Sequence, residues 1–166
     1  MIHRTAAHLC SISFAALLAC ATLLQPAVTS AQAIPVRHPQ GTLHGFLVLR
    51  TLKGDILADG DVIQVSRGNH VTTQLVFHFK DGSIHDETAT FSQDRTFRLL
   101  SDHLIQKGPS FPHPMELAIN GVTGRVTVRS TGDDGKEKVE SERLALPPDM
   151  SNGGLLTLLM NLPPGS

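Results

Sequence analysis

The chain has 166 residues and carries 14 basic and 15 acidic side chains, which gives a net charge of −1 with neutral histidines. It contains no Trp or Tyr and no block of Lys and Arg, so it lacks the charge and the stacking surfaces that nucleic-acid-binding proteins use. These features argue against nucleic acid as a partner, and the length allows one ordinary hydrophobic core.

A secretory signal peptide is predicted for residues 1–33. Basic Arg4 precedes an apolar run over residues 9–24, and the small-x-small pattern AQA follows at residues 31–33. This is the order of charged region, apolar region and cleavage site in such peptides. Cleavage after the pattern would leave residues 34–166 as a single β-rich domain, exported to the periplasm or the cell exterior. A membrane anchor is the rival interpretation. The apolar run over residues 9–24 is shorter than the roughly 20 apolar residues that a span needs.

Both cysteines, Cys10 and Cys20, lie inside that segment. Its removal would therefore leave no disulfide framework, no thiolate zinc site and no cysteine nucleophile. The alternative is a lipoprotein acylated at Cys20, because LLAC at residues 17–20 loosely matches a lipoprotein box. Leu18 and the apolar residues after Cys20 fit that box poorly, so cleavage after residue 33 is the preferred prediction.

Eight short β-type runs follow residues 34–41, which hold two prolines and show no periodicity. Turn residues separate them about every eight to twelve positions, which is the spacing of an antiparallel meander, sandwich or barrel. The sequence therefore predicts a mainly β fold, an antiparallel meander that forms a half-barrel or open sandwich. The predicted strands cover residues 43–52, 61–66, 71–80, 83–91, 95–105, 115–120, 125–130 and 136–144.

Three connections between these strands carry residues that tolerate positive φ: GN at 68–69, DG at 81–82 and DG at 134–135. Two-residue hairpin turns need such residues, because only those turns match the strand twist. A two-residue turn in the third hairpin predicts that Arg129 lies opposite Glu140, an opposite-charge pair that supports this register.

The second hairpin carries a candidate metal site. A two-residue turn predicts that His78 faces His85 directly, and strand alternation places Glu87 on the same surface with Asp86 on the other. Two imidazoles and a carboxylate could hold Zn²⁺ and leave one position for a water that the metal activates for hydrolysis. The ordinary alternative is a solvated sheet face, because no motif of fixed metal spacing such as HExxH occurs.

The proline-rich stretch QKGPSFPHPM interrupts the strands at residues 106–115. Its three prolines cannot lie in a central strand, because proline lacks the amide donor that the ladder needs. A loop of fixed extended shape is therefore predicted. His113 stands between two of these prolines and would be held in place as a candidate ligand-binding residue. The plainer interpretation is a rigid crossover between two strands.

The adjacent Ser101, Asp102 and His103 are not expected to form a catalytic triad. Neighbouring residues in an extended strand point to alternating faces, so Asp102 cannot bridge the other two. No glycine-rich nucleotide motif lies between a strand and a helix either. The sequence thus disfavours serine-hydrolase chemistry, hydride transfer and phosphoryl transfer.

One short helix is predicted near Pro148 to Asn161, because a proline can start a helix and the two prolines after Leu162 would stop it. GG at residues 153–154 weakens this helix by roughly 1 kcal/mol per glycine relative to alanine, so it needs burial against the sheet. A tail that contacts a membrane is the alternative, but it lacks a basic polar face. The side chains expected to pack on the concave face are Leu155, Leu156, Leu158, Leu159 and Met160, of which Leu155, Leu158 and Leu159 are candidate ligand contacts.

Four stretches carry a resemblance to a known family: residues 80–93, 96–115, 134–150 and 152–159, with QKGPSFPHPM as the most distinctive part. They resemble a family of exported bacterial proteins with a domain of unknown function. The resemblance implies export and β-structure, and no catalytic residue can be carried over from it. It also implies a two-part β-fold of which this chain would be the first part, with an open sheet edge available for self-association.

Together these patterns predict a non-enzymatic envelope or secreted protein that binds an apolar ligand or a partner segment in an open β-cup. No cofactor is predicted for that function. One alternative is a metal-dependent hydrolase that uses His78, His85 and Glu87 with zinc. Another is a structural module that docks a second chain by strand addition.

Overall fold

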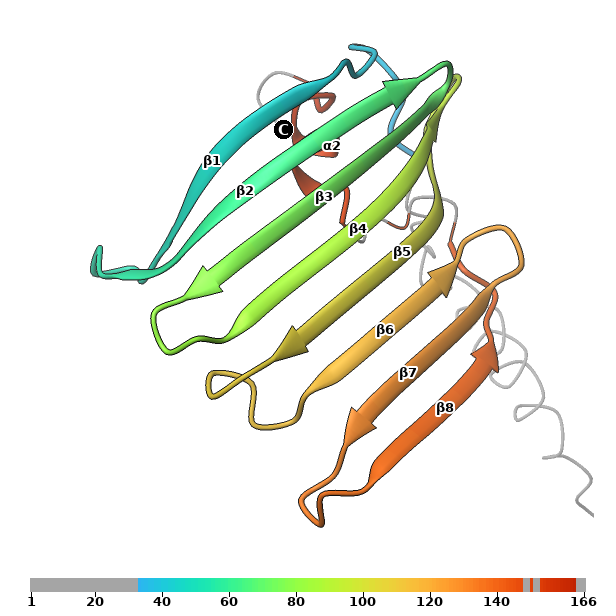
Figure 1. Cartoon of the computed structure of the whole chain (residues 1–166). Coiled ribbons are helices and arrows are strands. Elements are labelled where there is room, and N and C mark those ends of the chain that lie inside the picture. The colour runs from blue at the N-terminus through green and yellow to red at the C-terminus, as the bar shows by residue number, and fades with distance from the viewer. Residues whose placement is uncertain (1–32, 148–149, 151–152, 164–166) are drawn as a thin grey trace, which may run out of the picture. The chain divides into compact units, whose positions relative to one another are not determined.

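The computed structural model describes residues 33–147, 150 and 153–163. The predicted signal peptide lies outside these residues except for Ala33, and so does Cys20. Eight strands form one antiparallel sheet in which each strand pairs with its neighbours in sequence, so the predicted meander is confirmed (Figure 1). The strands are β1 (Leu43–Arg50), β2 (Ile56–Arg67), β3 (His70–Phe79), β4 (Ile84–Gln93), β5 (Phe97–Lys107), β6 (Met115–Asn120), β7 (Arg125–Thr131) and β8 (Glu137–Arg143).

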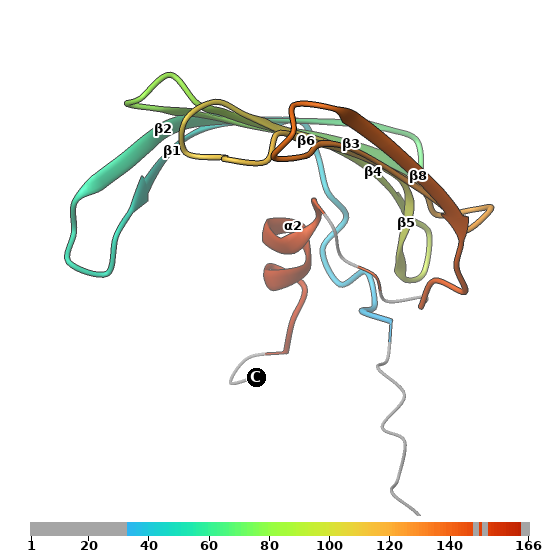
Figure 2. The ribbon, with the colours of Figure 1, turned by 90° about the horizontal axis from the view of Figure 1, so that it is seen from below.

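The sheet is open and curved, and β1 and β8 form its two edges. The short helix α2 (Leu155–Leu159) lies on the concave side, where the segment before β1 also runs (Figure 2). Side chains at alternate strand positions point toward this side and form the core. Phe91 of β4 is almost fully buried at its centre. Its partners in the core cluster are Ala89, Leu99 and Ile119.

Helix α2 is shorter than predicted. It begins at Leu155, after Gly154 at the N-cap position, so the glycines precede the helix instead of weakening its interior. Residues 148–149 and 151–152 of the predicted range lie outside the described residues. An added Cβ at Gly154 would collide with the Phe91 ring, so this glycine allows the chain to approach the core closely.

Only one side of α2 is buried. Five residues make about one and a half turns, so a helix of this length presents a single narrow face to the sheet. Leu158 packs there as predicted. The prediction is wrong for the other four side chains, which are between 47% and 62% exposed: Leu155, Leu156, Leu159 and Met160.

Four buried polar side chains, here called the Gln64 cluster, fasten α2 to the sheet. Thr73 and Thr157 both donate hydroxyl hydrogen bonds to Gln64 Oε1, at 3.3 and 3.2 Å. Asn161 donates to the Thr157 carbonyl at 2.9 Å, and its Oδ1 accepts from two backbone amides of the segment before β1, at 2.9 and 2.8 Å. The helix is therefore held by directed bonds as well as by burial. The cluster consists of Gln64, Thr73, Thr157 and Asn161.

The turn at residues 68–69 has two residues as predicted, because Arg67 pairs with His70. The predicted register of the third hairpin is wrong by one residue, since Arg129 lies opposite Val139 and not opposite Glu140. Its loop has three residues that end in Gly135 at φ +74°. This is a turn followed by a glycine bulge, the commonest three-residue hairpin loop.

The second hairpin also has a three-residue loop, so its predicted register is wrong by one residue as well. Phe79 N donates to the Ser83 carbonyl at 2.9 Å, and Gly82 adopts φ +85°. Asp81 Oδ1 accepts a hydrogen bond from Ser83 N at 2.9 Å. An Asp side chain that binds the backbone two residues on stabilises this kind of turn. The partner of His85 is therefore Phe77.

Candidate ligand-binding site

The three predicted metal ligands are not brought together. His78 pairs with Ile84, and the alternation of β3 directs it to the outer face. His85 and Glu87 share the concave face, as alternation within β4 predicts. Within the described part of the chain, no group of three or more His, Cys, Asp or Glu side chains could hold a metal ion. The one-residue shift in register is the physical cause, because it moves a side chain across the sheet.

The residue that does meet His85 from the next strand is Gln106 of β5. Its Nε2 lies 3.1 Å from His85 Nδ1. Because an amide nitrogen donates, Nδ1 accepts, and a neutral imidazole then carries its proton on Nε2. We call His85, Glu87 and Gln106 the His85 cluster.

The contact between His85 and Glu87 is looser. His85 Nε2 lies 3.8 Å from Glu87 Oε2, which is too long for a hydrogen bond. The two side chains are 21% and 14% exposed. The Nε2–H group and the carboxylate therefore retain hydrogen-bonding capacity toward a third group placed between or beside them.

The His85 cluster forms one wall of a cavity of about 460 Å³ on the concave side. Small-molecule sites typically occupy 300–1,000 Å³ and combine an apolar lining with a few polar groups. Gly153 also contributes to the lining. The apolar lining comes from β1, β3, the loop after β5 and α2, through Leu49, Leu75, Phe77, Phe79, Phe111, Leu155 and Leu156.

The proline-rich loop reaches this cavity through Phe111. Ser110 N donates to Ser83 Oγ at 2.7 Å, and Ser110 Oγ donates to Asp81 Oδ2 at 2.6 Å. Both bonds tie the loop to the turn of the second hairpin. The Phe111 ring then meets the Phe79 ring edge-on, with centroids 5.3 Å apart. The loop is thus anchored at its middle, where it completes the cavity wall.

These bonds also lower the pKa of Asp81 below its ordinary value. The largest cause is the hydroxyl of Ser110, followed by the backbone amide of Ser83. Hydrogen bonds to a carboxylate favour its charged form. The anchor of the loop therefore depends on an ionised Asp81.

The other predicted ligand contacts lie away from the cavity lining. His113 is exposed, and its Nδ1 lies 3.6 Å from Asp133 Oδ1 on the surface. Leu158 is a buried residue of α2, and Leu159 of the same helix is 53% exposed. Of the predicted leucines, Leu155 lines the cavity.

Ser101, Asp102 and His103 alternate between the faces, which confirms that they form no triad. Asp102 is 2% exposed on the concave side, whereas its two neighbours are exposed. His103 Nε2 lies 2.8 Å from Glu116 Oε1 on the outer face, and this hydrogen bond lowers the pKa of Glu116. The Asp102 carboxyl group lies on the concave side near Glu87, since a Cβ added at Gly153 would lie 3.4 Å from both Asp102 Oδ1 and Glu87 Cδ.

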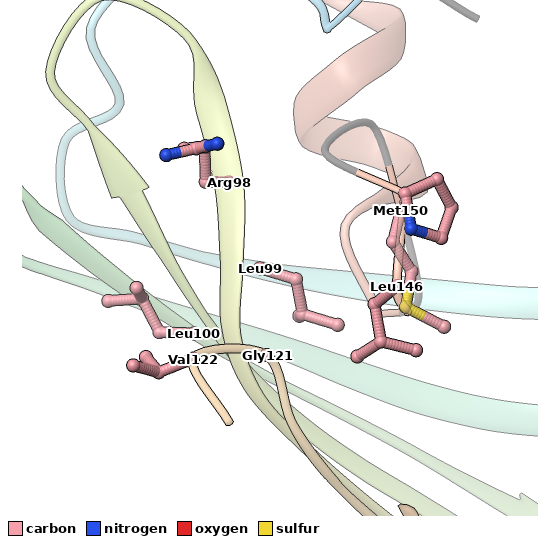
Figure 3. A pocket seen from close by; sticks show the side chains of 8 residues that line it. Arg98, Leu99, Leu100, Gly121, Val122, Leu146 and Met150 are labelled. Atoms are coloured by element: carbon pink, nitrogen blue, oxygen red, sulfur yellow. The ribbon is translucent and has the colours of Figure 1, made fainter. Parts of the chain in front are cut away.

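A second hollow, of about 490 Å³, lies beside the start of β5 and the turn after β6. There Leu99, Leu146 and Met150 point toward one another (Figure 3), and all three belong to or pack against the core cluster. Arg98 is the charged side chain among its described lining residues. The other side chains of the described lining are apolar, so this hollow offers no cluster of polar side chains to orient a ligand and is a weaker candidate than the cavity at the His85 cluster.

Two kinds of cavity residue escaped the sequence interpretation. Gln106 could be found only with the correct pairing of β4 and β5. Phe111 had a local signal, because it is the one aromatic residue in a proline-rich loop. The residue predicted from this loop was the titratable His113, which is not among the described lining residues.

Comparison with protein-family models, curated proteins and solved structures found no match to the chain. The resemblance to exported bacterial proteins therefore stays a prediction. In the described part of the chain, no helix is long and apolar enough to cross a membrane. The function has to be inferred from the cavity itself.

Proposed function

We propose that the protein binds a single-chain apolar molecule in the cavity beside α2, as a non-enzymatic binding protein outside the cytoplasm. The observation that carries this proposal is the cavity of about 460 Å³ with seven apolar lining residues and one polar cluster. The signal-peptide pattern in the sequence supports the location.

Exposed leucines at the cavity support an apolar ligand. Leu155 and Leu156 are 62% and 47% exposed although they line a concave site. Burying the exposed half of one leucine contributes roughly 1 kcal/mol, because a whole side chain contributes about 1.5–3 kcal/mol. A ligand that covers both side chains would gain this free energy.

The composition of the lining favours binding over covalent catalysis. The described lining contains no Ser, Thr, Cys, Lys or Tyr, and its residues of a nucleophilic type are His85 and Glu87. The His85 cluster supplies hydrogen bonds and one carboxylate. A metal-dependent hydrolase has less support, because His78 lies on the outer face.

Strand addition, the other alternative, would have to use β1. The edge strand β8 carries charged side chains at five of its seven positions, and charges on an edge discourage pairing. On β1, Phe46 and Val48 are exposed. The apolar cavity is a more specific feature than this edge, and it supports ligand binding as the proposed function.

The test uses the full-length chain and the uncharged fluorescent probe N-phenylnaphthylamine, whose emission rises in apolar surroundings. Leu156→Glu places a charge in the lining and should weaken probe binding by at least about tenfold, which corresponds to 1.4 kcal/mol.

The matched control is Leu159→Glu. It changes a similarly exposed leucine of the same helix that is not among the described lining residues, and probe affinity should stay within about twofold of wild type. Equal effects of the two substitutions, or no saturable binding by the wild type, would overturn the proposed function.

A further inference from the structure

We propose, on the basis of the binding function above, that the His85 cluster selects amphiphiles by their head group. The geometry points to a head group that donates hydrogen bonds and carries no negative charge, an ammonium or a hydroxyl, in preference to a carboxylate. Glu87 is the residue that determines this specificity.

The described lining of the cavity has a negative formal charge. Glu87 carries the one formal negative charge of the described lining, and no Lys or Arg accompanies it there. Asp102 adds a second carboxyl group nearby, because its Oδ1 and Glu87 Cδ would each lie 3.4 Å from a Cβ added at Gly153. Like charges at short range in a partly buried site repel strongly, because solvent screens them little. An anionic head group would therefore meet repulsion with no cation to offset it.

The direction of the hydrogen bonds in the His85 cluster also favours a donor head group. One N–H of the Gln106 amide is engaged with His85 Nδ1 at 3.1 Å. The gap of 3.8 Å leaves the Glu87 carboxylate as an acceptor and His85 Nε2–H as a donor. A hydroxyl can donate to the carboxylate and accept from Nε2–H, whereas an ammonium donates to the carboxylate with the added gain of charge.

The polar and apolar lining residues come from different parts of the fold. The polar members come from the adjacent strands β4 and β5, while the apolar members come from β1, β3, the loop after β5 and α2. An amphiphile would thus place its head against Glu87 and its chain along Phe77 toward α2. The orientation follows from where the two kinds of side chain lie.

The experiment measures displacement of N-phenylnaphthylamine from the full-length chain by decylamine, decanol and decanoate. These compounds share one chain length and differ in the head group. At about pH 8, where histidine side chains are ordinarily neutral, decylamine and decanol should bind at least about tenfold more tightly than decanoate. In Glu87→Gln, the preference for decylamine over decanoate should shrink to within about threefold.

The control is Asp86→Asn, which makes the same change in net charge on the outer face. Asp86 accepts a hydrogen bond from Gln74 there, at 3.1 Å, and its substitution should leave the preference unchanged. Both variants are compared with wild type by circular dichroism, and the wild-type series alone tests the selectivity if Glu87→Gln does not fold.

Tight binding of decanoate by the wild type, or equal effects of the two substitutions, would overturn the head-group selectivity while leaving the binding function intact. No displacement by any of the three compounds, together with no saturable probe binding, would overturn both.

Discussion

The Gln64 cluster and the His85 cluster both lie on the concave face. They differ in how much hydrogen-bonding capacity remains once their internal hydrogen bonds are formed. In the Gln64 cluster, Gln64 Oε1 accepts from two hydroxyls and its Nε2 donates to the Gly41 carbonyl at 2.9 Å. In the His85 cluster, one hydrogen bond of 3.1 Å is formed and the third side chain stands 3.8 Å away.

This difference distinguishes a cluster that stabilises the fold from the cluster of the proposed binding site. Buried polar groups are normally paired, and a fully paired network rigidifies a fold. The Gln64 cluster is buried and paired, so it has nothing to offer a ligand. The His85 cluster faces a cavity and retains capacity, which is what a recognition site needs. Both contain ordinary polar residue types, so residue type alone would not distinguish them.

The largest expected effect comes from breaking the paired cluster. Asn161 is fully buried and bonds three backbone groups, so Asn161→Ala should lower the free energy of unfolding by about 3 kcal/mol, because buried groups lose their partners. Urea unfolding measures this loss. The control Gln74→Ala changes an exposed polar residue and should shift stability by no more than about 0.5 kcal/mol. A loss below about 1 kcal/mol in Asn161→Ala would contradict the structural role of the cluster.

A smaller loss of stability is expected from a substitution that displaces α2 from the core. Such a displacement would disturb both clusters. The added Cβ in Gly154→Ala collides with Phe91, and the overpacking should cost about 2 kcal/mol. Probe binding should weaken as well, because α2 supplies part of the cavity wall. In the control Gly41→Ala the added Cβ meets nothing within 4 Å, and stability and probe binding should both stay close to wild type. A stable Gly154→Ala with unchanged binding would show that α2 does not pack as described.

The smallest effect concerns the anchor of the proline-rich loop, and it depends on pH. The folded-state pKa of Asp81 lies below the ordinary value of 3.8, so its stabilising contribution is fully present above that value. The contribution is lost as the pH falls through the lower folded-state pKa.

Ser110→Ala removes the largest cause of this lowering. The pKa of Asp81, measured from its carboxyl carbon by NMR titration, should rise toward 3.8, and the loss of stability at acid pH should become smaller. Ser101→Ala, an exposed serine on the outer face, is the control. An unchanged pKa of Asp81 in Ser110→Ala would mean that the hydroxyl does not hold this carboxylate.

The sequence predicted the sheet well, because strand runs and turn residues are local signals. It also placed His85 and Glu87 on one face, since alternation within a strand does not depend on the neighbouring strand. His78 was misplaced because that prediction needed the length of the turn. An Asp-Gly pair occurs both in two-residue turns and at the end of three-residue loops, and both Asp-Gly hairpins here use the longer form.

The Gln64 cluster could not be predicted from the sequence. Thr157 and Gln64 are 93 residues apart in the chain, and nothing local to either one marks the other as its partner. The same holds for Gln106 in the His85 cluster. Polar residues on a strand acquire their roles from tertiary contacts, which periodicity does not report.

The bonds from Asn161 to the backbone amides of Arg37 and His38 span 124 and 123 residues. During synthesis, residues 37–38 therefore emerge 124 and 123 residues ahead of their partner. Contacts so distant in sequence carry the largest loop-closure cost and form late. The sheet can therefore assemble strand by strand, while the cover over its concave side closes only after Asn161 has emerged. A prematurely ended chain would present a folded sheet with its apolar face open.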